Sequence, residues 1–207
     1  MDRERRILDA ATEAFCEKGF HGVGVDEIGK RAGLSGPSLY RHFSGKDEIL
    51  ATLLNEALDE LVSATVPVHG DPEQDLDRAV RHHIAFAVER RELVNLYQRD
   101  VRSLADPWRR PFDRRRSQYS ARWEELLSRR YPAAGSRVSV AAQSILGMIF
   151  SVSNWPRRTA QAKDVEKTLR CLIGTGLHGL EDGDRRSGDR ADPVPDLPGV
   201  SSNPASS

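Results

Sequence analysis

Apolar residues recur at helical spacing in almost every segment of this chain. Near the chain start they share one helix face, and the Gly19-Phe20 pair ends that run. The members of this face are Ile7, Ala10, Ala11, Ala14 and Phe15. No segment alternates convincingly with the two-residue period of a β-strand. The pattern therefore predicts an all-α fold.

Two short helices are predicted back to back within residues 24–46, GVDEIGKRAGLSGPSLYRHFSGK. Gly33 falls where the chain leaves the first helix, and Ser35 is placed to cap the second by accepting a backbone N–H. Pro37 sits in the first turn, where its missing N–H costs nothing. The second helix is short and polar, and the chain carries no acid between Glu27 and Asp47. These properties are typical of a helix-turn-helix unit that reads the DNA major groove.

Three sequence blocks keep their order and spacing around this unit, namely ILDAATEAFCEKGF, VDEIGKRAGLS and LYRHFSGKDEIL. Over about the first 60 residues they resemble the DNA-binding domain of the TetR family of transcriptional regulators. The resemblance implies a three-helix DNA-binding domain at residues 1–62 and a helical ligand-binding and dimerisation domain at residues 63–180. It also implies a homodimer that binds a palindromic operator, responds to a small molecule and acts as a repressor.

Eight residues are predicted to contact operator DNA: Ser35, Gly36, Pro37, Ser38, Tyr40, Arg41, His42 and Lys46. By the resemblance, Tyr40, His42 and Lys46 hold phosphates, whereas Gly36, Pro37, Ser38 and Arg41 are placed to approach base edges.

The net charge of the chain is zero, with 31 basic and 31 acidic residues, which by itself argues against a nucleic-acid partner. The acid-free stretch nevertheless concentrates four positive charges on the motif: Lys30, Arg31, Arg41 and Lys46. This local excess favours DNA binding.

Beyond Leu61 the helical pattern is interrupted at Pro67, Gly70 and Pro72, which predicts a connector at residues 64–73. Five further helices are predicted at residues 71–90, 92–105, 106–131, 136–155 and 163–180. By the resemblance, the last two pair with their symmetry mates in a four-helix dimer interface. Residues 181–207 are rich in Pro, Ser and Gly and are predicted to be a disordered tail.

Aromatic residues recur on the predicted helices of the second domain. For any single one, packing in the core is the favoured interpretation. Together they suit the lining of an apolar pocket between helices. The predicted lining is Phe86, Tyr97, Trp108, Phe112, Tyr119, Trp123, Phe150 and Trp155. We expect a small-molecule effector there, an acyl-CoA or another apolar ligand, and no cofactor.

Ten arginines lie between Arg99 and Arg130. Such a run is usually a solvated helix face. The alternative is that some of them, such as Arg109, Arg110 or Arg114, bind an anionic head group like the phosphates of an acyl-CoA. The sequence leaves both interpretations open.

No catalytic or metal-binding motif stands out. The chain contains no Glu-x-x-His pair and no His-Glu-x-x-His run, and the adjacent His82 and His83 point to different helix faces. Cys16 and Cys171 belong to no metal-spacing or redox motif. There is also no apolar run of membrane-spanning length and no secretory N-terminus, so a cytoplasmic protein that is not an enzyme is expected.

The alternative function is a helical protein–protein adaptor, or a small-molecule-binding bundle that does not bind DNA. An adaptor has no need for Tyr40, His42 and Lys46 to follow a capped, acid-free helix. The motif therefore favours a DNA-binding regulator.

Overall fold

A computed structural model describes residues 2–68 and 70–181, and all regular structure in these residues is helical. The α-helices, in chain order, are α1 Arg3–Lys18, α2 Val25–Arg31, α3 Gly36–Leu39, α4 Lys46–Ala64, α5 Pro72–Glu89, α6 Arg91–Asp100, α7 Arg109–Arg130, α8 Arg137–Ser151, α9 Arg157–Ala160 and α10 Val165–His178. Short 3₁₀ turns follow α6 (η1, Val101–Ser103), α7 (η2, Pro132–Ala134) and α8 (η3, Val152–Asn154). The all-α prediction is confirmed.

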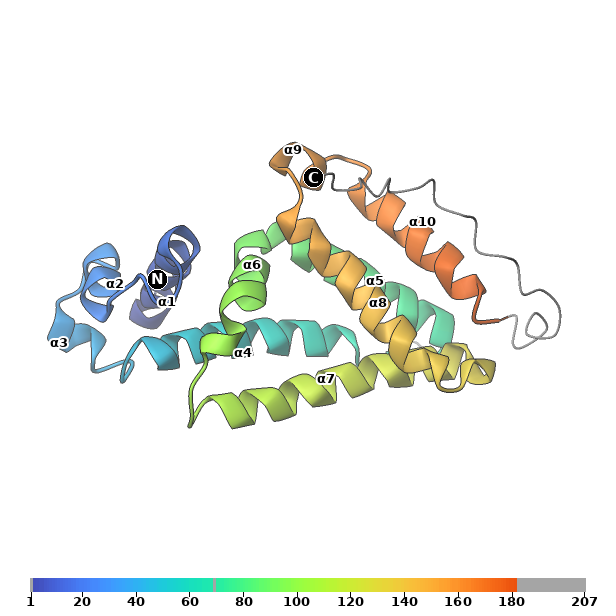
Figure 1. Cartoon of the computed structure of the whole chain (residues 1–207), viewed down its shortest axis with the longest axis horizontal. Helices are drawn as coiled ribbons and strands as arrows, with labels where there is room; N and C mark the ends of the chain where they lie inside the picture. The colour runs from blue at the N-terminus through green and yellow to red at the C-terminus, as the bar shows by residue number, and fades with distance from the viewer. Residues whose placement is uncertain (1, 69, 182–207) are drawn as a thin grey trace, which may run out of the picture.

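The first three helices and the start of α4 enclose a small core at one end of the molecule (Figure 1). Each helix contributes fully buried side chains to it, and these are Ile7, Phe15, Ile28, Leu39 and Ile49. Burying a side chain of this size contributes roughly 1.5–3 kcal/mol. The core therefore fixes the angle between α2 and α3, which sets the surface that α3 presents.

The second domain is built on α4 and α7, which run side by side, with α5, α8 and α10 inclined across them (Figure 1). Trp123 and Leu127 of α7 and Ile84 of α5 are 0 % exposed. The α7 helix thus supplies the centre of this core, although its other face is dense in charge. Within the described residues, none of the helices is both long and apolar enough to cross a bilayer.

Helix ends agree with the predicted capping residues in part. Asp71 caps α5 through a hydrogen bond from the Glu73 backbone N–H, with Pro72 in the first turn. Ser35 holds the N-cap position of α3, but its side chain accepts no capping hydrogen bond. Its carbonyl instead accepts the N–H groups of Ser38 and Leu39.

Two predicted helices are shorter than expected. The helix predicted at 92–105 ends at Asp100 and continues only as η1, and the one predicted at 136–155 ends at Ser151 before η3. In the second case Pro156 follows, and Trp155 before it is extended, because the residue before a proline avoids helical geometry. The short α9 after Pro156 was not predicted.

The connector at residues 64–73 coincides with the gap between α4 and α5. The predicted domain boundary at residue 62 falls inside α4, two residues before its end at Ala64. One continuous helix therefore belongs to both parts of the chain. The tail predicted from residue 181 onward lies, after its first residue, outside the described residues.

Candidate nucleic-acid interface and ligand cavity

The turn between α2 and α3 is tight because two glycines allow it. Gly33 has φ +67°, in the left-handed region, and the Leu34 N–H donates to the carbonyl of Gly29. At the end of α3 the chain changes from buried to exposed: Leu39 is 0 % exposed and lies in the core, whereas Tyr40 is 55 % exposed.

The predicted DNA-contact residues gather on and just after α3. Ser35, Pro37, Tyr40 and Arg41 are exposed, and Gly36, His42 and Lys46 are half-buried. Ser38 is the exception, since it is 8 % exposed and accepts a hydrogen bond from Arg41 Nη2 at 3.1 Å. The structure thus leaves seven of these eight residues exposed or half-buried and buries Ser38.

Lys46 is already engaged within the chain. Its Nζ donates to the carbonyls of Phe20 and Val23, each at 3.1 Å, and lies 4.6 Å from the centroid of the Phe20 ring. An ammonium group has three N–H donors. Lys46 therefore holds the turn after α1 against the start of α4 and keeps one donor for another acceptor.

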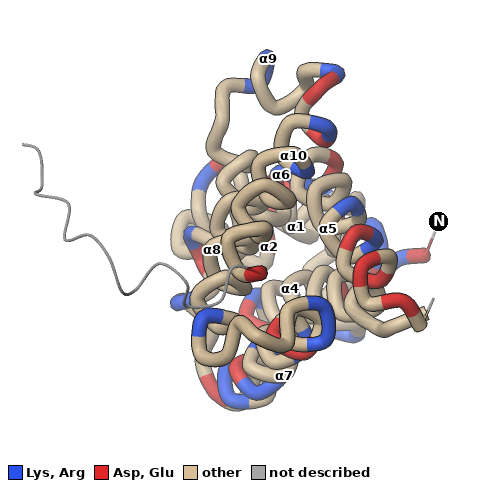
Figure 2. Tube along the Cα trace, turned by 90° about the vertical axis from the view of Figure 1, so that its right-hand side faces the viewer, with Lys and Arg blue, Asp and Glu red and all other residues tan. Residues whose placement is uncertain are grey.

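Arg31 is neutralised within the domain. It binds Glu17 at 2.6 Å and Glu27 at 3.0 Å, and Lys18 binds Glu27 at 2.7 Å. Hydrogen bonds from Lys18 and Arg31 lower the pKa of Glu27 below its ordinary value. Of the four predicted positive charges, Arg31 therefore belongs to an ion-pair network. Basic and acidic positions are also interleaved along the helices in the view of Figure 2.

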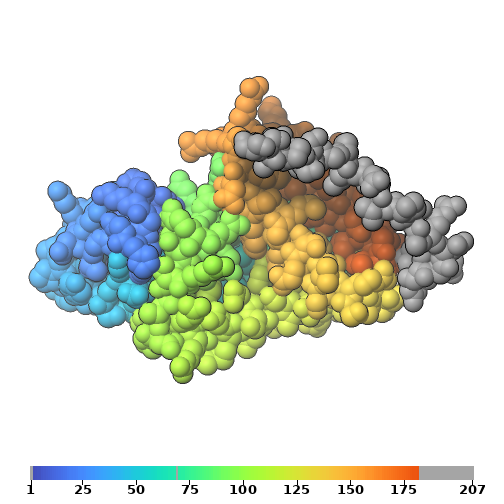
Figure 3. All heavy atoms as spheres, viewed as in Figure 1, coloured from blue at the N-terminus to red at the C-terminus, as the bar shows by residue number. Residues whose placement is uncertain are grey.

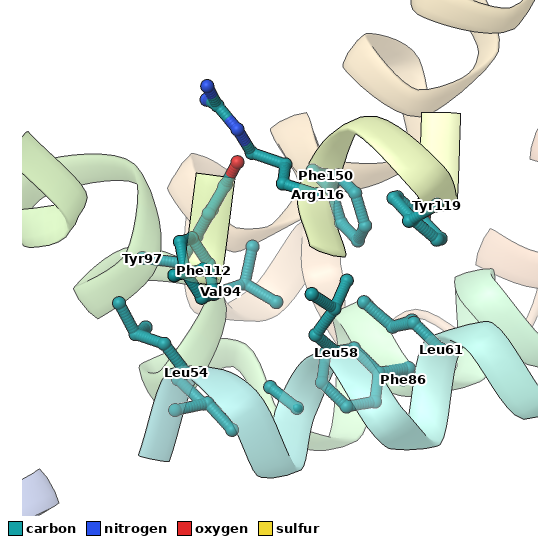
Figure 4. Close-up of a pocket in the computed structure, with 12 residues that line it drawn as sticks. Leu54, Leu58, Leu61, Phe86, Val94, Tyr97, Phe112, Arg116, Tyr119 and Phe150 are labelled. Atoms are coloured by element: carbon teal, nitrogen blue, oxygen red, sulfur yellow. The ribbon is translucent and has the colours of Figure 1, made fainter. Parts of the chain in front are cut away.

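An apolar cavity lies between α4, α5, α6, α7 and α8 (Figure 4). The cavity is small and opens to solvent at its mouth. Its walls are Leu54, Ala57, Leu58, Leu61, Phe86, Leu93, Val94, Tyr97, Phe112, Arg116, Tyr119 and Phe150. A cavity with so apolar a lining fits an apolar molecule or an apolar part of one.

Five of the eight predicted pocket residues line this cavity, namely Phe86, Tyr97, Phe112, Tyr119 and Phe150. The three tryptophans do not. Trp123 is 0 % exposed and packs edge-on against His83 in the core. Trp108 directly precedes α7, and Trp155 follows η3, where its carbonyl accepts from Arg91.

Sequence reasoning missed the contribution of α4. Leu54, Leu58 and Leu61 form one wall of the cavity, as Figure 4 shows. These leucines are spaced three or four residues apart along the helix, so their shared face was visible in the sequence.

The mouth of the cavity carries polar groups. In Figure 4 the Tyr97 hydroxyl and the Arg116 side chain extend toward the same side, away from Leu58 and Leu61. A second, more polar groove between α6, α7 and α8 shares Tyr97, Arg116, Tyr119 and Phe150 with the cavity. An elongated molecule can therefore occupy both spaces.

The arginines suggested for an anionic head group lie elsewhere. Arg109 pairs with Asp113 at 3.5 Å and Arg110 with Asp106 at 3.1 Å. Neither of them, nor Arg114, lines the cavity or the groove. Arg116 is the arginine that does.

The α6–η1 segment connects the cavity to the first domain. Arg99 donates to the carbonyls of Phe15 and Cys16 at the end of α1, and Cys16 Sγ donates to Glu92 O at 3.4 Å. Ser103 Oγ lies 3.0 Å from His21 Nε2. In Figure 3 the green atoms of this region lie directly against the blue first domain. Because α6 also forms a cavity wall, a change in the cavity can reach the first domain through it.

Comparison with known proteins identifies the class to which this fold and interface belong. The model for "Bacterial regulatory proteins, tetR family" matches residues 7–53, and the model for "Tetracyclin repressor-like, C-terminal domain" matches residues 69–166. The regulator YdeS of Bacillus subtilis, whose own function is uncharacterised, is 31 % identical over 153 residues, covering 70 % of this chain and 75 % of YdeS. The chain belongs to the TetR family of transcriptional regulators.

Two further relatives support this assignment. The transcriptional repressor KstR2 of Mycobacterium tuberculosis is 28 % identical over 137 residues, covering 61 % of this chain and 65 % of KstR2. The crystal structure of the TetR-family regulator PfmR from Thermus thermophilus superimposes with a TM-score of 0.72 at 28 % identity, over 85 % of this chain and 99 % of PfmR. For the first four curated relatives the match spans 28 % to 54 % of their length.

Proposed function

We propose that this protein is a ligand-responsive transcriptional repressor that acts in the cytoplasm, where it binds a palindromic operator as a homodimer. An apolar small molecule in the cavity changes its affinity for that operator. The observation that carries this proposal is the continuity of α4, which starts at Lys46 beside the DNA-contact residues and lines the cavity with Leu54, Leu58 and Leu61. Ligand site and DNA site thus share one rigid element.

The proposed DNA surface is the exposed edge of α3. Pro37, Tyr40 and Arg41 are its exposed side chains near the start and end of the helix. Tyr40, His42 and the remaining donor of Lys46 are proposed to hold phosphates, and Arg41 to reach a base edge. In the free protein the Arg41 side chain donates a hydrogen bond to Ser38 Oγ. Contact with a base edge would therefore require the Arg41 side chain to change rotamer.

The proposed dimer interface is formed by α8 and α10. Three large apolar side chains on these helices are exposed in the single chain: Val140 at 68 %, Met148 at 37 % and Leu172 at 55 %. Removal of such side chains from water would stabilise association by about 25 cal/mol per Å² of apolar surface. Dimerisation also places two copies of α3 on successive major grooves.

The proposed effector has an apolar body that occupies the apolar cavity. Arg116 and Tyr97 at the mouth suit a polar or anionic extension in the neighbouring groove, as an acyl-CoA would have. The effector acts on DNA binding only if it favours one arrangement of the two domains. Its contacts with α4 and with α6 supply that preference.

The direct test is selection of DNA fragments by the purified protein from a genomic library, followed by binding assays on the recovered site. The expected result is a palindromic site bound by two chains, with affinity that falls when an apolar ligand is added. Binding to all fragments alike would refute sequence-specific regulation. Failure to bind any fragment would instead favour the small-molecule-binding bundle that does not bind DNA.

A further inference from the structure

The residues that line the apolar cavity differ in exposure, and the difference marks two sides of it. Seven of the twelve lining residues are buried, and five are half-buried or exposed. Three of these five, Tyr97, Arg116 and Phe150, also line the polar groove between α6, α7 and α8. The other two, Ala57 and Leu93, also line a different groove, which lies between α1, α4, α5, α6 and α9. Ala57 and Leu93 therefore form the wall between the cavity and the groove beside α1.

This wall lies away from the mouth of the cavity. In Figure 4, Arg116 of α7 lies across the cavity from Leu58 of α4. Ala57 directly precedes Leu58 in α4. Leu93 precedes Tyr97 by four residues, so both lie on one face of α6, with Leu93 about 6 Å nearer the start of the helix. A molecule held at Arg116 by one end can therefore direct its other end toward Ala57 and Leu93.

The surroundings change from apolar to charged at this wall. Arg116 is the one charged residue among the twelve that line the cavity. Beyond Ala57 and Leu93, ten of the seventeen residues that line the groove beside α1 are charged. The wall thus separates an apolar space from a charged one.

The charged groups beyond the wall are paired with one another and hydrated. Glu56 of α4 binds Arg5 at 2.9 Å, and Glu60 lies 4.0 Å from Arg90. These four side chains are between 43 % and 59 % exposed. A methylene group among them would displace water from charged groups, which offsets the gain from leaving water itself. An apolar chain therefore gains affinity as far as the wall and none beyond it.

We infer that Ala57 and Leu93 set the greatest chain length that contributes to effector binding, with the polar end of the effector held near Arg116. This inference rests on the proposed effector site and names the residues that determine its selectivity for length. Inside the cavity each added methylene tightens binding about fourfold, equivalent to about 0.8 kcal/mol. Affinity plotted against chain length thus has a break, and the wall fixes its position.

The test is calorimetric titration of the protein, without DNA, with saturated n-alkanoates from butanoate to dodecanoate. In wild type, affinity is expected to rise about fourfold per methylene up to the break and to stay level beyond it. Ala57→Leu fills space at the wall, so it should move the break to a shorter chain and weaken binding of the chain of wild-type break length about tenfold. Leu93→Ala removes bulk from the wall and should move the break to a longer chain.

Two further variants separate the wall from the rest of the site. Ser63→Leu adds the same leucine to an exposed position of α4 that does not line the cavity, and it should leave the break in place. Arg116→Gln removes the charge at the mouth. It should weaken binding of every alkanoate by a similar factor, about threefold, without moving the break.

Opposite displacements of the break in Ala57→Leu and Leu93→Ala also exclude a general loss of stability as their cause, since a destabilised protein would bind all chains less tightly. Three results would overturn the inference: affinity that keeps rising to dodecanoate, a break that neither wall variant moves, or failure of every alkanoate to bind.

Operator binding at saturating alkanoate, measured separately, distinguishes this inference from the proposed function. A break that moves as expected, without any effect of alkanoate on operator binding, would refute the regulatory proposal and leave the length limit standing. Loss of operator binding, with a break that the wall variants do not move, would refute the length limit alone.

Discussion

The contact between Arg99 and the end of α1 gives a direct test of how the two domains communicate. Arg99 donates to the Phe15 and Cys16 carbonyls from α6, the helix that also walls the cavity. A cation at a helix C-terminus is favourable because it faces the negative end of the helix dipole. We predict that Arg99→Ala weakens the effect of effector on operator binding.

The magnitude follows from these contacts. Hydrogen bonds to a charged group contribute about 1.5–3 kcal/mol, but the Arg99 side chain is 47 % exposed and solvent screens it. We therefore assign about 1 kcal/mol to the contact between Arg99 and the carbonyls at the end of α1. If this free energy contributes fully to the coupling between effector and operator binding, the ratio of operator Kd with and without effector should fall about fivefold in Arg99→Ala.

The assay is fluorescence anisotropy of labelled operator across an effector titration. Arg102→Ala is the matched control, since Arg102 lies in η1 and is exposed. Effector affinity measured without DNA should be nearly the same in Arg99→Ala and wild type. An unchanged Kd ratio in a folded Arg99→Ala dimer would show that α6 does not transmit the signal.

Three further predictions concern other parts of the molecule. Lys46→Ala should weaken binding to all DNA sequences and lower the slope of log K against log salt concentration by about one. Arg41→Ala should instead relax the preference at particular base pairs, and selection from a randomised operator separates the two effects. Leu172→Asp should place an unpaired carboxylate in the α8–α10 interface and shift sedimentation from dimer to monomer; a wild-type monomer at micromolar concentration would contradict that interface. His83 has a folded pKa of about 3, below its unfolded value of 6.5, so its contribution to stability is complete above pH 6.5 and is lost as pH falls toward 3. Denaturant midpoints should therefore decline below pH 6.5, with a slope of at most about 1.4 kcal/mol per pH unit from this group, and His83→Phe should flatten that decline.

The DNA-binding domain could be predicted well from sequence because its signals are local. Gly33, Pro37 and the acid-free stretch act within one or two turns of the chain, where backbone preferences decide the outcome. The pairing of Glu27 with Arg31 also follows from their spacing of four residues. The partnership of Arg31 with Glu17 depends on how α1 packs, which no local signal reveals.

The cavity was only partly predictable. Periodicity identifies the apolar face of a helix, but it does not say which neighbour covers that face. Trp123 lies on the same face as Tyr119 and yet packs into the core, because α5 covers it. The sequence pattern assigns Leu58 and Leu61 to the first domain, because it predicts a boundary at residue 62, inside the α4 helix that both domains share.

The shared helix also constrains how this regulator can acquire new specificity by mutation. A substitution at Leu54 or Leu58 alters the cavity and, through the same helix, the seating of Lys46, which we propose as a phosphate contact. Changes in Phe112 or Phe150, which line the cavity from α7 and α8, alter the cavity without that second effect. Selection for response to a new effector should therefore accumulate changes in α7 and α8, while the α4 wall tolerates few.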